Sequence, residues 1–243
     1  ENDSASYLQR TKALNEARQK QWRNKCVSDT YYPGSVFKMV TSSMGFEEGI
    51  ISENTPFSCP GYYVVADRRI SCWKSGGHGS ETFAQGLCNS CNPVFIQVGE
   101  KLGAQTFFEY FEAFGFTQKT GIDLPGESRS IYYDETMGPV ELATESFGQN
   151  FSITPIQMIT AAAAVANGGY LVQPHVVAQV IDDEGNIIRT TDTTVKRQVI
   201  SNETSRRVSA ILQQTATTGT AKNGYIAGYR VAGKTGTSEK IAE

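Results

Sequence analysis

The strongest helix signal in the pattern of apolar and polar residues lies in the segment 154–166. Thr154, Pro155 and Gln157 mark its start, because a threonine N-cap, a proline at the first helical position and a glutamine three residues after the cap are typical of a capping box. Apolar residues then occur nearly all round the predicted helix, so we expect it to be buried. The Asn-Gly-Gly sequence at 167–169 ends it.

Helical patterns also occur in four other segments, which are residues 7–23, 35–46, 82–115 and 203–217. The first is polar with few apolar anchors, whereas the second is apolar enough to form a buried helix that starts at Ser35. Residues 82–115 are long enough for two or three helices. In the last segment Val208, Ile211 and Leu212 share one face, which predicts a helix packed on the core.

Short strands are predicted between and after these helices. Residues 62–65 and 69–72 have strand character, and residues 176–181 and 187–190 flank the sequence Asp-Asp-Glu-Gly-Asn, which favours a hairpin. Residues 229–237 alternate and predict a further strand. This mixture predicts an α+β fold in which helices surround an antiparallel sheet.

Composition and charge narrow the class of protein. The 243 residues are enough for one large domain with a real core, and 39% of them are hydrophobic. The net charge is −3 without a run of lysine or arginine, which excludes an electrostatic nucleic-acid footprint. No apolar stretch reaches the roughly 18–20 residues of a membrane span. Because Glu1 is not an initiator methionine, we expect a piece of a longer protein, in which missing targeting segments carry no information.

The cysteines are ambiguous. The chain has five, namely Cys26, Cys59, Cys72, Cys88 and Cys91, and an odd number cannot form a fully paired set within one chain. Cys88 and Cys91 have the CxxC spacing of zinc or redox sites. A zinc site would need Cys59 and Cys72 as its second pair, but twelve residues separate them, whereas structural zinc sites usually offer two tight pairs. We therefore predict no metal and no cofactor.

Histidine does not supply a catalytic base in this sequence. A Ser-His-Asp site would need His78 or His175 together with a GxSxG elbow, and the sequence has no such elbow. His78 lies in a glycine-rich loop, which favours a structural or solvated role. The base must be another residue.

Ser35 and Lys38 offer that base. At a helix start a serine and a lysine three residues later face the same side, and a lysine whose pKa is lowered can take the serine proton. The free N–H groups of the helix start point toward charge that develops near Ser35. An SxxK pair is expected about once by chance in such a chain, and Ser71 with Lys74 is a second copy. Ser71 follows a strand-like piece and precedes glycines, so Lys74 would not share a helix face with it.

Two further triplets follow the first in a fixed order. The three motifs are Ser35-Val36-Phe37-Lys38, Ser90-Cys91-Asn92 and Lys234-Thr235-Gly236-Thr237. Two other triplets have the same patterns but do not fit the site. Ser52-Glu53-Asn54 is too close behind Lys38 to be the SxN motif, and Lys119-Thr120-Gly121 leads into a loop rather than ending a strand. The order SxxK, SxN, KTG is the signature of penicillin-binding proteins and serine β-lactamases, which the sequence therefore resembles.

The resemblance covers nearly the whole chain. The sequence Tyr-Pro-Gly-Ser-Val-Phe-Lys at 32–38 resembles the PGSxFK block of class B penicillin-binding proteins, and residues 121–127 and 148–169 are also typical of that class. Cys72-Trp73-Lys74, the Gly-Gly-His-Gly loop at 76–79 and the cysteine inside the SxN triplet are similar to sporulation-specific members from endospore-forming Gram-positive bacteria. This resemblance implies a penicillin-binding protein/serine β-lactamase-like fold with a mostly helical subdomain. It also implies a single transpeptidase domain over residues 1–243, incomplete at both ends.

The implied reaction is a two-step acyl transfer on peptidoglycan stem peptides. Ser35 attacks the D-Ala-D-Ala amide and releases D-Ala, and an amino group of a neighbouring stem then takes the acyl group. The resemblance implies that Lys38 is the base, that Ser90 relays a proton to the leaving amine, and that Asn92 holds Lys38 and the substrate amide.

The KTG segment has an implied binding role. Lys234 would stabilise negative charge and support Ser90, while Thr235 and Thr237 would bind the terminal carboxylate. Gly236 lets the backbone approach a ligand closely. The N–H groups of Ser35 and Thr237 would form the oxyanion hole.

The resemblance also implies partners and a place in the cell. β-Lactams would acylate the nucleophile, and a glycosyltransferase of the elongation, division or sporulation type and a thiol reductant are candidate partners. The domain would lie at the extracytoplasmic face of the membrane, held by an N-terminal helix outside this sequence, and would act in spore cortex synthesis. Two alternatives stay open, a β-lactamase and a non-enzymatic β-lactam sensor. A β-lactamase is disfavoured because Glu127 and Glu141 lie in segments that are typical of transpeptidases.

A redox switch is a separate expectation from the cysteine positions. Cys91 lies between Ser90 and Asn92, and Cys72 lies in a turn-rich region that could fold over the cleft. A Cys72–Cys91 disulfide would displace the catalytic groups, and a thiol reductant would restore them. Cys88 is a rival partner for Cys91, but the i, i+3 spacing on a helix strains a disulfide. Equally open is that Cys91 is a small buried hydrophobe and Cys72 an unrelated surface thiol.

Overall fold

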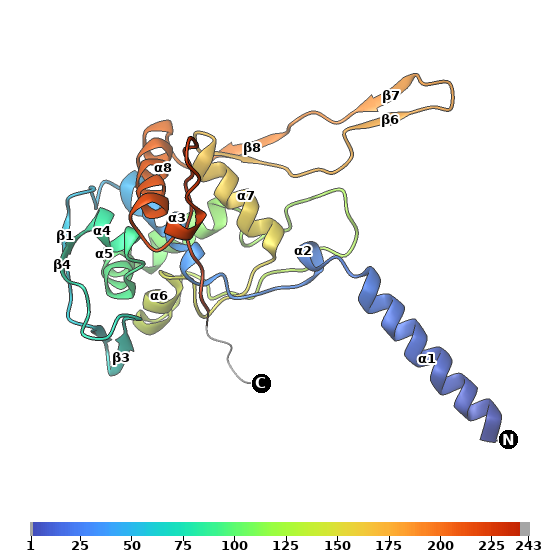
Figure 1. The fold of residues 1–243 in the computed structure, drawn as a ribbon, viewed down its shortest axis with the longest axis horizontal. Helices are drawn as coiled ribbons and strands as arrows, with labels where there is room; N and C mark the ends of the chain where they lie inside the picture. Colours follow the sequence, from blue (N-terminus) through green and yellow to red (C-terminus); the bar gives the residue numbers. More distant parts are fainter. Residues whose placement is uncertain (1, 239–243) are drawn as a thin grey trace.

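The computed structural model describes residues 2–238 (Figure 1). Its α-helices are α1 Asn2–Trp22, α2 Lys25–Ser28, α3 Lys38–Glu47, α4 Phe83–Cys88, α5 Asn92–Ala113, α6 Pro139–Glu145, α7 Pro155–Ala166 and α8 Asn202–Thr217. Two 3-10 turns are η1 Gly34–Val36 and η2 Lys222–Gly224. None of the helices between residues 2 and 238 has the length and apolar character needed to cross a membrane.

The strands of residues 2–238 pair only two by two, and every pair is antiparallel. They are β1 Pro56–Cys59 with β4 Gly79–Thr82, β2 Tyr62–Val65 with β3 Arg68–Ser71, β5 Tyr170–Val172 with β8 Val195–Gln198, and β6 Gln179–Ile181 with β7 Ile187–Thr190. Helices with small antiparallel sheets confirm the α+β prediction.

An aromatic cluster lies at the centre of the main body. Phe37, two residues after the predicted nucleophile, is fully buried, and its ring lies 4.8–6.1 Å from four other rings. Those rings belong to Phe107, Phe111, Phe116 and Phe151. Burial of such large side chains is the main stabilising term of a core, so the turn that carries Ser35 stands on the best-packed part of the molecule.

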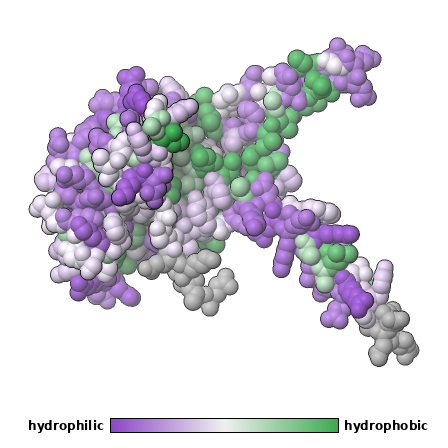
Figure 2. All heavy atoms as spheres, in the orientation of Figure 1, coloured by the Kyte–Doolittle hydropathy of each residue, from purple (hydrophilic) through white to green (hydrophobic). Residues whose placement is uncertain are grey.

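Two segments project from this body. Helix α1 extends away on one side, and the hairpin of β6 and β7 extends on another (Figure 1). Figure 2 shows apolar side chains along the projecting hairpin, where Val180, Ile181, Ile187 and Ile188 are exposed.

The helix and hairpin predictions are largely confirmed. The capping box at Thr154 is present, and α7 ends at Ala166 as predicted. Burial of α7 is one-sided rather than complete, because Ile159 is 61% exposed. Residues 82–115 hold α4 and α5, and Gly103, with a φ of 75°, interrupts the helical geometry of α5.

Two element predictions need correction. The helix expected from Ser35 begins as the 3-10 turn η1, and α-helical geometry starts only at Lys38, because Gly34 has a φ of +56°. The strand expected at 229–237 is wrong for the described residues: that segment has no regular structure. A strand needs ladder hydrogen bonds, whereas here the N–H of Tyr229 donates to the nearby carbonyl of Ile226 and the N–H of Gly233 to the carbonyl of Leu212 in α8, which is not a ladder.

Candidate active site

The three motifs come together at the start of α3. Gly34 donates its N–H to the carbonyl of Gly148 at 2.8 Å, and a Cβ on Gly34 would overlap the carbonyl oxygen of Thr237. A Cβ on Gly236 would come within 2.6 Å of the Val36 side chain. The turn that carries Ser35 therefore packs directly against the KTG segment, and glycine is required at both sides of that contact.

Lys38 lies at the centre of the site and is completely buried. Its Nζ donates hydrogen bonds to the carbonyl of Ser90 at 2.8 Å and to Oδ1 of Asn92 at 2.7 Å, and it lies 3.4 Å from Oγ of Ser90. Helix α3 provides Lys38, whereas Ser90 and Asn92 come from the junction of α4 and α5, more than fifty residues later.

A second lysine reaches the same hydroxyl. Nζ of Lys234 lies 2.8 Å from Oγ of Ser90 and also donates to the carbonyl of Thr235 at 3.0 Å. Ser90 has a φ of 55°, which is uncommon for a residue other than glycine and places its hydroxyl between the two ammonium groups. Such a hydroxyl is in reach of both lysines, so a proton can pass through it.

Burial sets the electrostatics of both lysines. Desolvation lowers the pKa of Lys38 well below its ordinary value, and the charge of Lys234 lowers it further, while Cys91, Cys72 and Glu81 act in the opposite direction. Desolvation also lowers the pKa of Lys234 to about 8, against a smaller opposing effect of Cys88. Two adjacent ammonium groups in a poorly solvated site favour neutral Lys38.

The remaining predicted binding residues line an accessible edge. Thr235, Gly236 and Thr237 are exposed, and the Thr235 hydroxyl lies 3.1 Å from that of Thr220. An exposed run of hydroxyl and backbone groups beside Ser35 is suited to bind a carboxylate.

The second SxxK sequence does not form a helical pair, as predicted. Ser71 is the exposed last residue of β3 and Lys74 is exposed in the following turn, so they do not form a helical pair. The backbone of Ser71 nevertheless contacts the site, because Nδ2 of Asn92 lies 3.5 Å from its carbonyl oxygen.

The cysteines group differently from the CxxC spacing. Cys72 and Cys91 are free thiols. Their sulfur atoms, the sulfur of Cys59 and a ring nitrogen of His78 all lie within 4.8 Å of one another. Cys88 turns instead toward α8, where its sulfur lies 3.9 Å from the carbonyl of Ile211. The alternative that Cys72 is a surface thiol is wrong, since it is 8% exposed.

The two central thiols influence each other. A hydrogen bond with Cys91 lowers the pKa of Cys72 to about 5, and the same interaction raises the pKa of Cys91. From the sequence, Cys59 with Cys72 was considered and rejected as a pair because of its wide spacing, and His78 was missed as a member of this cluster. The glycines around His78 were the one signal of a constrained loop.

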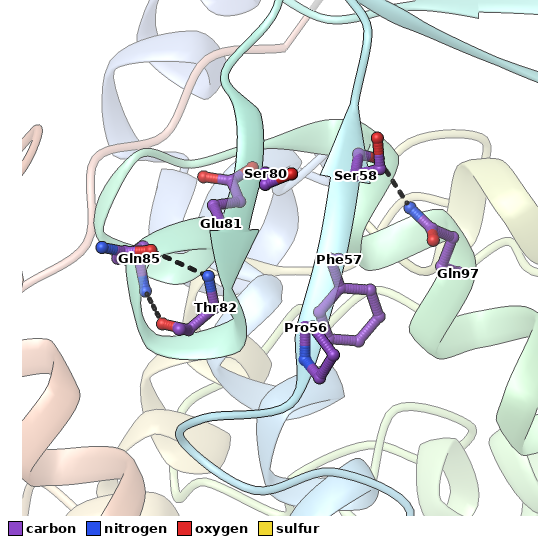
Figure 3. Close-up of a pocket in the computed structure, with 8 residues that line it drawn as sticks. All are labelled: Pro56, Phe57, Ser58, Ser80, Glu81, Thr82, Gln85 and Gln97. Atoms are coloured by element: carbon purple, nitrogen blue, oxygen red, sulfur yellow. Dashed lines mark hydrogen bonds between the residues drawn. The ribbon is translucent and has the colours of Figure 1, made fainter.

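A separate surface depression lies along β1 and β4 (Figure 3). It is lined by Pro56, Phe57, Ser58, Ser80, Glu81, Thr82, Gln85 and Gln97. Figure 3 shows the hydrogen bonds that hold its walls, from Gln97 to the Ser58 carbonyl and within the capping box of Thr82 and Gln85. None of the motif residues lines it, so we do not assign the reaction to this depression.

Comparison with known proteins agrees with the geometry of the three motifs. The family described as penicillin binding protein transpeptidase domain matches residues 2–243. Stage V sporulation protein D of Bacillus subtilis (strain 168) is 43% identical over 224 residues, which cover 91% of this chain and 35% of that protein. The chain therefore spans about a third of the length of this curated relative.

Two solved structures are similar over most of the chain. The D,D-transpeptidase domain of a peptidoglycan glycosyltransferase from Eggerthella lenta has a TM-score of 0.86 at 29% identity and covers 95% of this chain and 60% of its own. Penicillin binding protein 3 from Mycobacterium tuberculosis, complexed with aztreonam, has a TM-score of 0.82 at 27% identity and covers 90% of this chain and 50% of its own. The chain belongs to the penicillin-binding protein transpeptidase domain family.

Proposed function

We propose that this domain is a D,D-transpeptidase that cross-links peptidoglycan stem peptides through an acyl-enzyme on Ser35. The observation that carries the proposal is the buried Lys38, one turn after Ser35, whose Nζ contacts both Ser90 and Asn92. A neutral amine at this place can act as a base toward the serine hydroxyl. The names of the similar proteins support the same reaction.

In the first step Oγ of Ser35 attacks the carbonyl carbon of the D-Ala-D-Ala amide while Lys38 accepts the hydroxyl proton. The N–H groups of Ser35 and Thr237 donate to the oxyanion. The C–N bond then breaks, and the leaving amine of D-Ala takes a proton relayed by Ser90. The contact of Ser90 with both lysines supports this relay.

In the second step an amino group of a neighbouring stem peptide attacks the ester of Ser35. Its excess proton leaves along the same relay, and the ester C–O bond breaks to restore the serine hydroxyl. Thr235 and Thr237 hold the terminal carboxylate in the first step, while Lys234 stabilises negative charge and supports Ser90. Asn92 orients both Lys38 and the substrate amide. The 2.7 Å hydrogen bond from Lys38 to Asn92 supports the role of Asn92.

A β-lactam would acylate Ser35 in place of the dipeptide. The aztreonam complex of the similar Mycobacterium tuberculosis protein supports this expectation. Hydrolase activity is less well supported, because Glu127 is used structurally: its carboxylate accepts hydrogen bonds from the N–H and hydroxyl of Thr120, both at 2.6 Å. These bonds tie Glu127 to the loop at Thr120 and Gly121, which supports a structural role for its carboxylate.

The similarity to stage V sporulation protein D supports a role in sporulation, and we propose synthesis of the spore cortex at the extracytoplasmic face of the membrane. A glycosyltransferase that supplies the glycan strands is the partner this reaction requires. The Cys72–Cys91 pair stays a candidate redox switch: a disulfide would form with loss of two electrons and two protons to an oxidant, and a dithiol reductant would reverse it. The close approach of the two sulfur atoms supports it.

Fluorescent penicillin tests the proposal on this 243-residue chain. We expect one stable adduct per chain that persists for hours, because a transpeptidase lacks a base placed for deacylation. Rapid turnover of the label would identify a β-lactamase. Stable labelling without release of D-Ala from a D-Ala-D-Ala stem peptide would identify a sensor, and absence of labelling would contradict the acyl-enzyme.

The rate of penicillin acylation should depend on pH through Lys234. Its pKa of about 8 means that it is charged below that pH and loses its proton above it; the titratable groups that interact electrostatically with it are Lys38 and Cys88. Acylation requires the charged form, so we expect the second-order rate constant to fall by about tenfold per pH unit above pH 8. In Lys234→Arg the guanidinium keeps its charge, so this fall should be absent. A flat profile up to pH 10 in the unsubstituted chain would contradict the role of Lys234.

A further inference from the structure

Four side chains with metal-binding atoms meet beside the candidate active site. They are Cys59 at the end of β1, Cys72 after β3, His78 before β4 and Cys91 at the N-cap of α5. Their three sulfur atoms and a ring nitrogen lie within 4.8 Å of one another. The three cysteines are buried and the His78 side chain is 5% exposed, so the group is closed to bulk water.

The distances suit a tetrahedral ion. Nδ1 of His78 lies 3.7 Å from the sulfur of Cys59 and 3.5 Å from that of Cys72. Around a tetrahedral zinc with Zn–S of about 2.3 Å and Zn–N of about 2.0 Å, a sulfur and a nitrogen ligand are about 3.5 Å apart, and two sulfur ligands about 3.8 Å. Both of these sulfur–nitrogen distances match a tetrahedral site, and the other separations, all within 4.8 Å, exceed the ideal values by about 1 Å at most.

The local backbone is arranged to make this group. A Cβ on Gly77 would overlap the carbonyl oxygen of Cys59, and the N–H of His78 donates to that same carbonyl at 3.1 Å. The N–H of Cys72 donates to the carbonyl of Gly61 at 2.9 Å. The glycine-rich loop is thus pressed against β1, and its function in this arrangement is to bring His78 and Cys72 to Cys59.

A buried carboxyl group lies beside the group of metal-binding atoms. Oε1 of Glu81 is buried without a hydrogen-bond partner among the described residues and lies 3.9 Å from Nδ1 of His78. Its other oxygen accepts a hydrogen bond from Asn89 at 2.9 Å. Glu81 therefore borders the group without being one of its members.

We propose that Cys59, Cys72, His78 and Cys91 form a structural zinc site. Three thiolates and one imidazole in closed tetrahedral geometry favour Zn²⁺ over the oxygen-preferring Mg²⁺ and Ca²⁺. On binding, each of the three thiols releases its proton to solvent and the imidazole binds as the neutral ring. The site needs reduced thiols, so a Cys72–Cys91 disulfide and a bound zinc exclude each other.

The zinc site would position the SxN triplet. Cys91 stands between Ser90 and Asn92, so a metal bond to its sulfur holds both neighbours at Lys38 and ties them to the strand pair β1–β4. This consequence, unlike the metal site itself, rests on the proposed transpeptidase function. Loss of the metal should then slow penicillin acylation by about 10–100-fold.

The test begins with the metal and needs no activity. The chain, purified anaerobically, should retain about one zinc by elemental analysis. Replacement by Co²⁺ should give the intense visible bands of a tetrahedral thiolate site together with sulfur-to-metal charge transfer. Cys59→Ser and His78→Ala should lose the zinc and the bands. Cys26→Ser and Cys88→Ser are matched controls that should keep both, because these cysteines lie outside the group.

Each outcome decides the proposal. If the reduced, unsubstituted chain contains no zinc and its titration with Co²⁺ gives no colour, the proposal is overturned without reliance on any variant. Full metal binding by Cys59→Ser would also overturn it. Stoichiometric zinc with penicillin acylation unchanged after chelation would confirm the site and refute its positioning of the SxN triplet. Stoichiometric zinc in a chain that penicillin never labels would confirm the site and contradict the proposed function instead.

Discussion

Replacement of Ser35 by alanine is expected to abolish covalent labelling by penicillin, with a loss of at least about 10³-fold in the second-order rate constant. No other hydroxyl of the site stands one turn before a buried lysine. Ser90 touches both lysines, but its backbone carbonyl and hydroxyl are already bound by Lys38 and Lys234. These contacts support the proposed role of Ser90 as a proton relay rather than as the nucleophile.

Ser71→Ala is the matched control for Ser35→Ala. Ser71 begins the second SxxK sequence, but it is exposed at the end of β3 and only its backbone carbonyl contacts Asn92. We expect this variant to label within about twofold of the unsubstituted chain, because surface changes away from special contacts usually have small effects. Peptide mapping of the adduct by mass spectrometry identifies the acylated residue, and attachment to Ser71 or Ser90 would refute the assignment.

The catalytic constellation could be predicted from sequence because its parts are local motifs in a fixed order. Ser35 and Lys38 are one turn apart, and the resemblance supplied the pairing with Ser90, Asn92 and Lys234, which the structure brings into contact. Residue spacing by itself carries no signal for the long-range contacts. The approach of Lys234 to a hydroxyl 144 residues earlier in the chain was expected from the resemblance alone.

The strand predicted at 229–237 and the cysteine grouping indicated by the CxxC spacing were both wrong because tertiary contacts decide them. The alternating residues 229–237 have strand propensity, but a strand forms only where a neighbour supplies ladder hydrogen bonds. The metal-binding atoms of Cys59 and His78 meet those of Cys91 through the pairing of β1 with β4, a contact that short-range spacing rules cannot represent. The CxxC rule pointed to Cys88, which turns toward α8. Tertiary contacts, and not spacing, decide which cysteines meet.

The geometry of Lys38 makes it sensitive even to a change that keeps its charge. It has no exposed surface, and its single nitrogen makes both the bond to the Ser90 carbonyl and the bond to Asn92. Arginine is longer, carries its charge on a planar fork and does not lose its proton near neutral pH. Lys38→Arg should therefore remove the proposed base and distort its surroundings. Lys101→Arg makes the same exchange at an exposed position of α5 and serves as the control.

Lys38→Arg is expected to lower the rate constant for penicillin acylation by about 10²–10⁴-fold, the usual contribution of a general base, while Lys101→Arg leaves it unchanged. The physical reason is that burial and the neighbouring charge of Lys234 lower the pKa of Lys38, so the lysine can be neutral where an arginine stays charged. Stopped-flow measurement of acylation, with circular dichroism to show that each variant is folded, distinguishes loss of the base from loss of structure. Addition of small primary amines should partly restore a folded Lys38→Ala variant, because a neutral amine in the vacated space can accept the Ser35 proton. Acylation of folded Lys38→Arg at a rate near that of the unsubstituted chain would show that Lys38 contributes only its charge, and Ser35 would then need another base.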